Sequence, residues 1–119
     1  MGSLACDLAA EDVPALGDTS NLLPGYKTFS AAKQDLGSPG VGNVFDHTVE
    51  QSQIGRSGFA PEEIHSPYNL NPVPAGLNQL KANYYSSIRA FTGGGTVRDW
   101  LTGQSFADQY EFGMDIMMC

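Results

Sequence analysis

Phe45-Asp46-His47-Thr48-Val49-Glu50-Gln51 is the stretch on which the interpretation of this chain depends. It places a carboxylate beside an imidazole at the end of a short β-prone segment, Asn43-Val44-Phe45. Neighbouring side chains in a strand point to opposite faces, so Asp46 and His47 can serve one site only where the chain twists or bends. A carboxylate can hold a divalent cation while a neighbouring imidazole takes a proton from water. The stretch therefore raises the hypothesis of a metal-assisted hydrolytic site.

Short elements are predicted around this stretch. A helix capped by Thr28 or Ser30 is expected to end at Gly37, because glycine is a natural C-terminal stop. After the strand, residues 51–58 hold two glycines and predict a turn or an open loop. Residues 60–65 predict a single helical turn with proline at its first position.

The second half of the chain predicts one more strand and then helices. Two prolines restrict residues 69–74 to an edge strand or an extended arm. The pattern then becomes helical, with a buried stripe expected at Leu77, Leu80, Tyr84, Tyr85 and Ile88, and surface positions at Asn78, Lys81 and Arg89. Thr96 is expected to cap a helix over 97–101, and Ser105 to open a last helix toward Met117. The last two helices are expected to bury Trp100, Leu101, Phe106, Tyr110, Met114 and Met117.

Length and composition indicate one small folded domain. A chain of 119 residues with 41% hydrophobic content can bury one modest core but not two. Residues 1–22 show no sustained period and predict a flexible leader or linker, so the domain is expected to span 23–119. Cys6 and Cys119 lie near opposite ends and indicate neither a disulfide framework nor a thiolate zinc site.

The charge of the chain argues against nucleic acid as a partner. The formal net charge is −7, whereas nucleic-acid binders usually carry a basic surface. Four of the thirteen acidic residues lie in the N-terminal segment, so nine acids and six bases remain beyond it, a formal charge of −3. A bound divalent cation would offset part of that remainder. No apolar run approaches the roughly 20 residues that span a bilayer, so no membrane association is expected.

Several short motifs in order resemble one family. They are Phe45-Asp46-His47-Thr48-Val49-Glu50-Gln51, Phe59-Ala60-Pro61-Glu62-Glu63-Ile64-His65, Tyr68-Asn69-Leu70, Tyr84-Tyr85-Ser86-Ser87-Ile88 and Thr96-Val97-Arg98-Asp99-Trp100-Leu101. Residues 26–116 thereby resemble the HNH-type (ββα-metal, His-Me finger) nuclease toxin domains of bacterial polymorphic toxins and secretion-system effectors. The resemblance implies an α+β fold, a small HNH ββα-metal core with additional helices at both ends.

The resemblance also implies roles for individual residues. His47 would be the general base, Asn69 would bond loop backbone and keep His47 aimed, and Asp46 and Asn78 would hold one divalent cation. Asp46 and Asn78 stand where many relatives have histidines, which favours Mg²⁺ or Mn²⁺ over Zn²⁺ or Ni²⁺. Supporting positions near the metal are considered for Glu50 and His65, and phosphate contacts for Arg56, Lys81, Arg89 and Arg98.

The function implied is a metal-dependent endonuclease that cleaves DNA with little sequence preference. As a toxin it would be secreted or translocated by a bacterial secretion system, act in the cytoplasm of the target cell, and be restrained in its producer by a cognate immunity protein. Two alternatives remain open on the residues alone. One is a catalytically inactive, HNH-derived module that binds a partner, and the other is a toxin that cleaves RNA.

Overall fold

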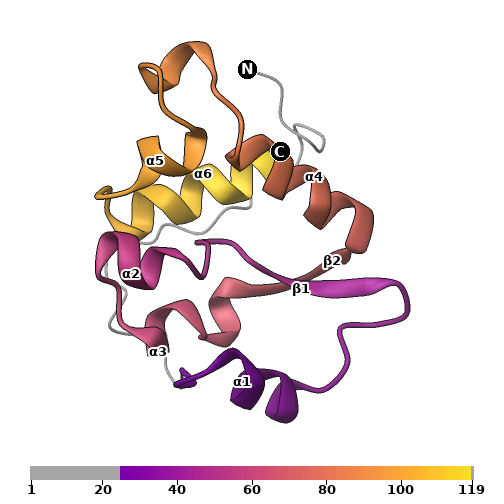
Figure 1. Ribbon diagram of the computed structural model, residues 1–119. Coiled ribbons are helices and arrows are strands. Elements are labelled where there is room, and N and C mark those ends of the chain that lie inside the picture. Colours follow the sequence, from indigo (N-terminus) through magenta and orange to yellow (C-terminus); the bar gives the residue numbers. More distant parts are fainter. Residues whose placement is uncertain (1–24, 119) are drawn as a thin grey trace.

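The structure, a computed structural model, describes residues 25–118. Within them, β1 (Asn43–His47) and β2 (Leu70–Pro74) form a two-stranded antiparallel sheet in which His47 pairs with Leu70. Helices surround this ribbon, as Figure 1 shows. They are α1 (Phe29–Leu36), α2 (Gln53–Ser57), α3 (Pro61–Ile64), α4 (Ala75–Tyr85), α5 (Val97–Leu101) and α6 (Phe106–Met118), with 3₁₀ turns η3 (Pro67–Asn69) and η4 (Ala90–Thr92). The expected α+β class is confirmed at this level.

The order β1, connection, β2, α4 positions the candidate site. The connection from residue 48 to 69 contains α2, α3 and η3, and α4 begins directly after Pro74 at the end of β2. Helix α4 contacts both strands, and α1 lies on the other side of the ribbon (Figure 1). The ribbon is therefore covered by one helix from each half of the chain.

Local capping explains where the predicted helices begin. The hydroxyl of Thr28 accepts a hydrogen bond from the backbone N–H of Ala31 at 3.0 Å, so Thr28 caps α1. The hydroxyl of Thr96 accepts from the backbone N–H of Asp99 at 3.0 Å, and the hydroxyl of Ser105 accepts from Asp108 at 3.0 Å. These contacts confirm the expected starts of α1, α5 and α6.

Two hydrophobic clusters form the core. The larger joins β2 to α4, α5 and α6 through Val73, Tyr84, Tyr85, Val97, Leu101, Ile116 and Met117. The smaller joins the β1–β2 connection to α6 through Val49, Ile64, Phe106 and Tyr110. Helix α6 belongs to both clusters, so it fixes the connection relative to α4.

Some sequence predictions are wrong. A turn or an open loop was expected at 51–58; residues 51–52 form a turn, but Gln53–Ser57 forms the helix α2, and Gly58 after it adopts a left-handed conformation. Leu80 and Ile88 are 53% and 65% exposed rather than buried, and Trp100 is 38% exposed. Lys81, expected on the surface, is only 2% exposed. The leader predicted at 1–22, with Cys6, and the terminal Cys119 lie outside the described residues.

Candidate functional site at the end of β1

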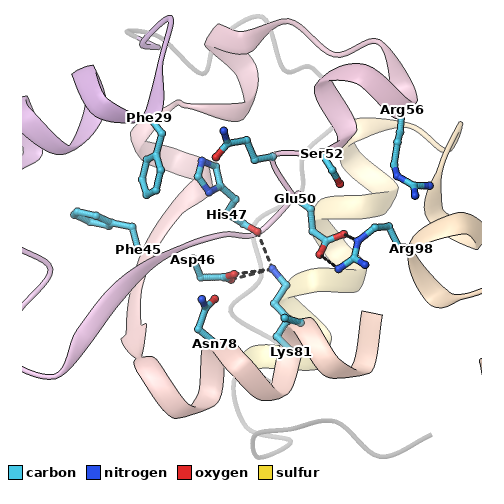
Figure 2. A pocket seen from close by; sticks show the side chains of 12 residues that line it. Phe29, Phe45, Asp46, His47, Glu50, Ser52, Arg56, Asn78, Lys81 and Arg98 are labelled. Carbon is cyan, nitrogen blue, oxygen red and sulfur yellow. Dashed lines mark hydrogen bonds and ion pairs between the residues drawn. The ribbon is translucent and has the colours of Figure 1, made fainter. Parts of the chain in front are cut away.

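The end of β1 directs Asp46 and His47 to different neighbours. Figure 2 shows the carboxylate of Asp46 turned toward Lys81 on α4, while the ring of His47 points toward Phe29 on α1. The alternation of side chains along the strand is thus kept to its last residue. Both side chains nevertheless border one cavity, of about 550 Å³.

Asp46 forms a buried ion pair with Lys81. The ammonium Nζ lies 2.8 Å from Oδ1 and 3.0 Å from Oδ2, and the two side chains are 7% and 3% exposed. The same Nζ also donates to the backbone carbonyls of His47, at 2.7 Å, and Thr48, at 3.2 Å. An ammonium has three protons, so these four acceptors use its full donor capacity.

His47 packs between two rings. Its ring centroid lies 4.5 Å from that of Phe29 in an edge-to-face arrangement, and its Nε2 lies 3.2 Å from Nδ1 of His65. Burial, with the nearby His65 and Lys81, lowers the pKa of His47 to about 3, and burial also lowers the pKa of His65. Both imidazoles are therefore neutral at physiological pH. Nδ1 of His47 has no hydrogen-bond partner within residues 25–118.

Asn69 holds the connection that follows β1. It is fully buried; its Oδ1 accepts from the backbone N–H of Val49 at 2.8 Å, and its Nδ2 donates to the carbonyls of Val49, at 3.0 Å, and Ile64, at 2.9 Å. Its own carbonyl accepts from the N–H of Thr48 at 2.9 Å. These are backbone contacts of the kind expected for Asn69, and they fix the chain immediately after His47. A role in catalysis stays a prediction.

The cavity collects seven of the ten predicted site residues. Its lining includes Asp46, His47, Glu50, Arg56, Asn78, Lys81 and Arg98. His65 and Asn69 do not line it and lie buried behind His47 and the connection. Arg89 is separate: its guanidinium lies over the ring of Tyr84, and its Nε donates to Ser87.

The other charged residues of the cavity are also paired. Arg98 donates to both carboxylate oxygens of Glu50, at 2.7 and 2.6 Å, and this contact raises the pKa of Arg98. Arg56 donates to Asp99 at 2.9 Å in a solvent-exposed pair. A phosphate entering the cavity would compete with carboxylates for these guanidinium groups.

The donor set does not fit the divalent cation that the resemblance implies. Both carboxylate oxygens of Asp46 accept hydrogen bonds from Lys81. Of the two proposed metal ligands, only the amide of Asn78 is therefore without such a partner charge. No group of three or more His, Cys, Asp or Glu side chains able to hold a metal occurs within residues 25–118. A cation at Asp46 would have to displace a buried ammonium from its partner, and breaking such a pair costs roughly 3–5 kcal/mol.

Two features of the site were missed from the sequence. Phe29 was not among the predicted site residues, yet it packs on His47 and lines the cavity. Lys81 was predicted on the surface. It lies four residues after Leu77, three before Tyr84 and four before Tyr85. That spacing puts Lys81 on the buried face of α4, and it was the signal available in the sequence.

Comparisons with protein-family models, curated proteins and solved structures found no match to this chain. Among the described helices, none has the length and apolar character needed to cross a membrane.

Proposed function

We propose that this protein is an endonuclease with an HNH-type ββα core, acting as an antibacterial toxin or effector domain. The observation that supports this best is the placement of His47 at the end of β1, directly before a connection held by Asn69, with α4 following β2 against the same strand. The resemblance implies a general base and a supporting asparagine at these two positions, so their placement supports the proposal.

In this proposal His47 takes a proton from a water molecule that attacks the phosphorus of a phosphodiester. The ring is neutral, which is the form that accepts a proton, and Nδ1 has no hydrogen-bond partner in the described part of the chain. A bound phosphate would raise the low pKa of His47, because a nearby negative charge favours the imidazolium. Burial next to His65 and Phe29 would keep the ring in one orientation.

The positive groups of the cavity would oppose the charge that develops on the phosphate. Lys81, Arg56 and Arg98 all line it, and Arg56 is the most exposed of these side chains at 41%. Fixed positive groups at the reacting phosphate lower the barrier to hydrolysis because they stabilise the transition state. Metal ions are not assigned a step, since the donor set does not fit one.

DNA is the proposed substrate. RNA is the alternative substrate, because the residues of the site do not distinguish the two. The toxin setting would require secretion or translocation into a target cell and a cognate immunity protein in the producer. Because the chain is acidic, a basic inhibitor face would associate with it quickly.

A second candidate is a catalytically inactive module derived from the same fold that binds a partner. The Asp46–Lys81 ion pair favours it, because Lys81 occupies the carboxylate that a metal-dependent nuclease would use to bind its cation. The net charge of −7 favours it too.

Cleavage assays separate the two candidates. Purified wild type and His47→Ala would be incubated with supercoiled plasmid and, in parallel, with RNA, in Mg²⁺, Mn²⁺, Zn²⁺, Ni²⁺ or EDTA. Nicking by wild type that is lost in His47→Ala, with an unchanged circular dichroism spectrum, is the expected result. A folded wild-type protein that cleaves neither substrate in any buffer would leave the binding module as the better candidate.

A further inference from the structure

We infer that the ammonium of Lys81 is the resident cation of this site and takes the place that a divalent ion would occupy at Asp46. Where it concerns cleavage, the inference rests on the proposed nuclease function. Where it concerns metal binding, it can be tested without any activity.

The first support is the coordination of Nζ. Four oxygens surround it within 3.2 Å: both carboxylate oxygens of Asp46 and the carbonyls of His47 and Thr48. These oxygens come from the last two residues of β1 and the residue after it, the part of the chain that carries His47. A set of carboxylate and carbonyl oxygens is the type of environment that binds hard cations. Here an ammonium already fills it.

The second support is the position of Lys81 on α4. Lys81 lies three residues after Asn78, so the two side chains share a face of the helix, and Figure 2 shows both directed toward Asp46. Helix α4 thus presents to Asp46 an amide and a positive charge. With the carboxylate neutralised by Lys81, an entering divalent ion would meet a centre with no net negative charge and a like charge close by.

The third support is burial. Asp46 and Lys81 are each nearly inaccessible, and the ring of Tyr85 lies 5.2 Å from Nζ as a cation–π partner. Lys81 cannot turn into solvent without leaving a buried carboxylate unpaired, so it is held in place by the same contacts that exclude a metal. The consequence for the proposed nuclease is cleavage that persists in EDTA.

Metal titration of the full-length chain tests the inference. Wild type, Lys81→Met and the control Lys27→Met would be titrated with MnCl₂ by calorimetry, and paramagnetic broadening of the backbone amide signals of residues 46–48 would be followed by NMR. Lys27 is an exposed lysine outside the cavity. We expect neither heat nor selective broadening for wild type and Lys27→Met. Lys81→Met, which frees the carboxylate, should bind Mn²⁺ at least about tenfold more tightly than wild type.

Adding Asp46→Asn to Lys81→Met should remove this binding again, which places the ion at Asp46. Stoichiometric Mn²⁺ binding by wild type, with broadening at residues 46–48, would overturn the inference whether or not the protein cleaves nucleic acid. If Lys81→Met does not fold, the wild-type titration alone decides. If wild type neither binds metal nor cleaves nucleic acid, the proposed nuclease function is rejected and the inference that Lys81 is the resident cation stands. If it cleaves in EDTA and binds no metal, the nuclease function and the inference are both supported.

Discussion

Asn69 connects two distant parts of the chain through one buried amide. Its three side-chain hydrogen bonds reach the backbone of Val49, after β1, and of Ile64, at the end of α3. The resemblance to HNH-type domains implied this kind of backbone contact for Asn69, and the amide can make it because it offers a donor and an acceptor on one short side chain. The sequence also predicted that Asp46 and His47 lie together, but not that they face different partners.

Replacing Asn69 with alanine should lower the free energy of unfolding by roughly 2–3 kcal/mol, because buried backbone groups of Val49 and Ile64 lose their partners. Urea unfolding followed by circular dichroism would measure the change. The control is Asn83→Ala, since Asn83 is an exposed asparagine on α4. A loss for Asn69→Ala no larger than that of the control would contradict a tethering role.

The two imidazoles predict a loss of stability on acidification. The pKa of His47 falls from its usual 6.5 to about 3 in the folded protein, and that of His65 is lowered too, chiefly by burial. Below about pH 6.5 the unfolded chain therefore binds more protons than the folded chain, so stability is lost as the pH falls from about 6.5 toward 3. Thermal unfolding between pH 7 and 5 would show it, because carboxylates remain largely ionised there.

The chain contains only two histidines, so the double variant His47→Gln/His65→Gln has no imidazole left to titrate in this window. We expect its unfolding midpoint to vary much less with pH than that of wild type. Equal pH dependence in the two proteins would show that other groups are responsible.

At the level of elements, α4 shows what a helical period can and cannot specify. The choice of Leu80 and Ile88 as buried residues followed hydrophobicity, whereas the structure buries Leu77, Lys81, Tyr84 and Tyr85, with Leu77 in part. Both sets fit a helical spacing. What decides between them is the carboxylate of Asp46 on β1, a partner 35 residues away that the local pattern of α4 does not reveal. The capped helices were predictable, because their start signals are local.

Helix α6 makes a close approach to the end of β1. A Cβ atom on Gly113 would lie 2.5 Å from the backbone carbonyl oxygen of Thr48, closer than such atoms can pack. Gly113→Ala should therefore destabilise the fold, by about 1–3 kcal/mol, despite the better helix propensity of alanine. The control is Gly76→Ala in α4, where an added Cβ meets no atom within 4 Å.

Because Gly76 lies in a helix and has room, Gly76→Ala should stabilise the protein by about 0.5–1 kcal/mol. Chemical unfolding of the two variants would thus give changes of opposite sign. A stabilised Gly113→Ala would show that α6 can move away from Thr48 at no cost.

For the whole molecule, the sequence was sufficient to predict an α+β domain, both strands, and seven of the residues that border one cavity. It was not sufficient to predict how the charges of that cavity are distributed. Each pair, Asp46 with Lys81, Glu50 with Arg98 and Arg56 with Asp99, joins residues more than 30 positions apart, so only the packed fold brings them together. Arg89 was grouped with these cations because of its charge, although it lies outside the cavity.

This distribution of charge predicts weak, only mildly salt-dependent binding of nucleic acid. Among the described residues that line the cavity, only Arg56, Lys81 and Arg98 are positively charged, so at most three phosphates are neutralised there. The logarithm of the affinity for duplex DNA should then fall against the logarithm of the salt concentration with a slope no steeper than about −3. Fluorescence anisotropy on the His47→Ala background, which avoids cleavage, would measure it. Arg56→Gln should make that slope shallower by about 1, whereas Arg89→Gln should leave it unchanged. A steeper slope, or equal effects of the two variants, would place the DNA on another surface of the protein.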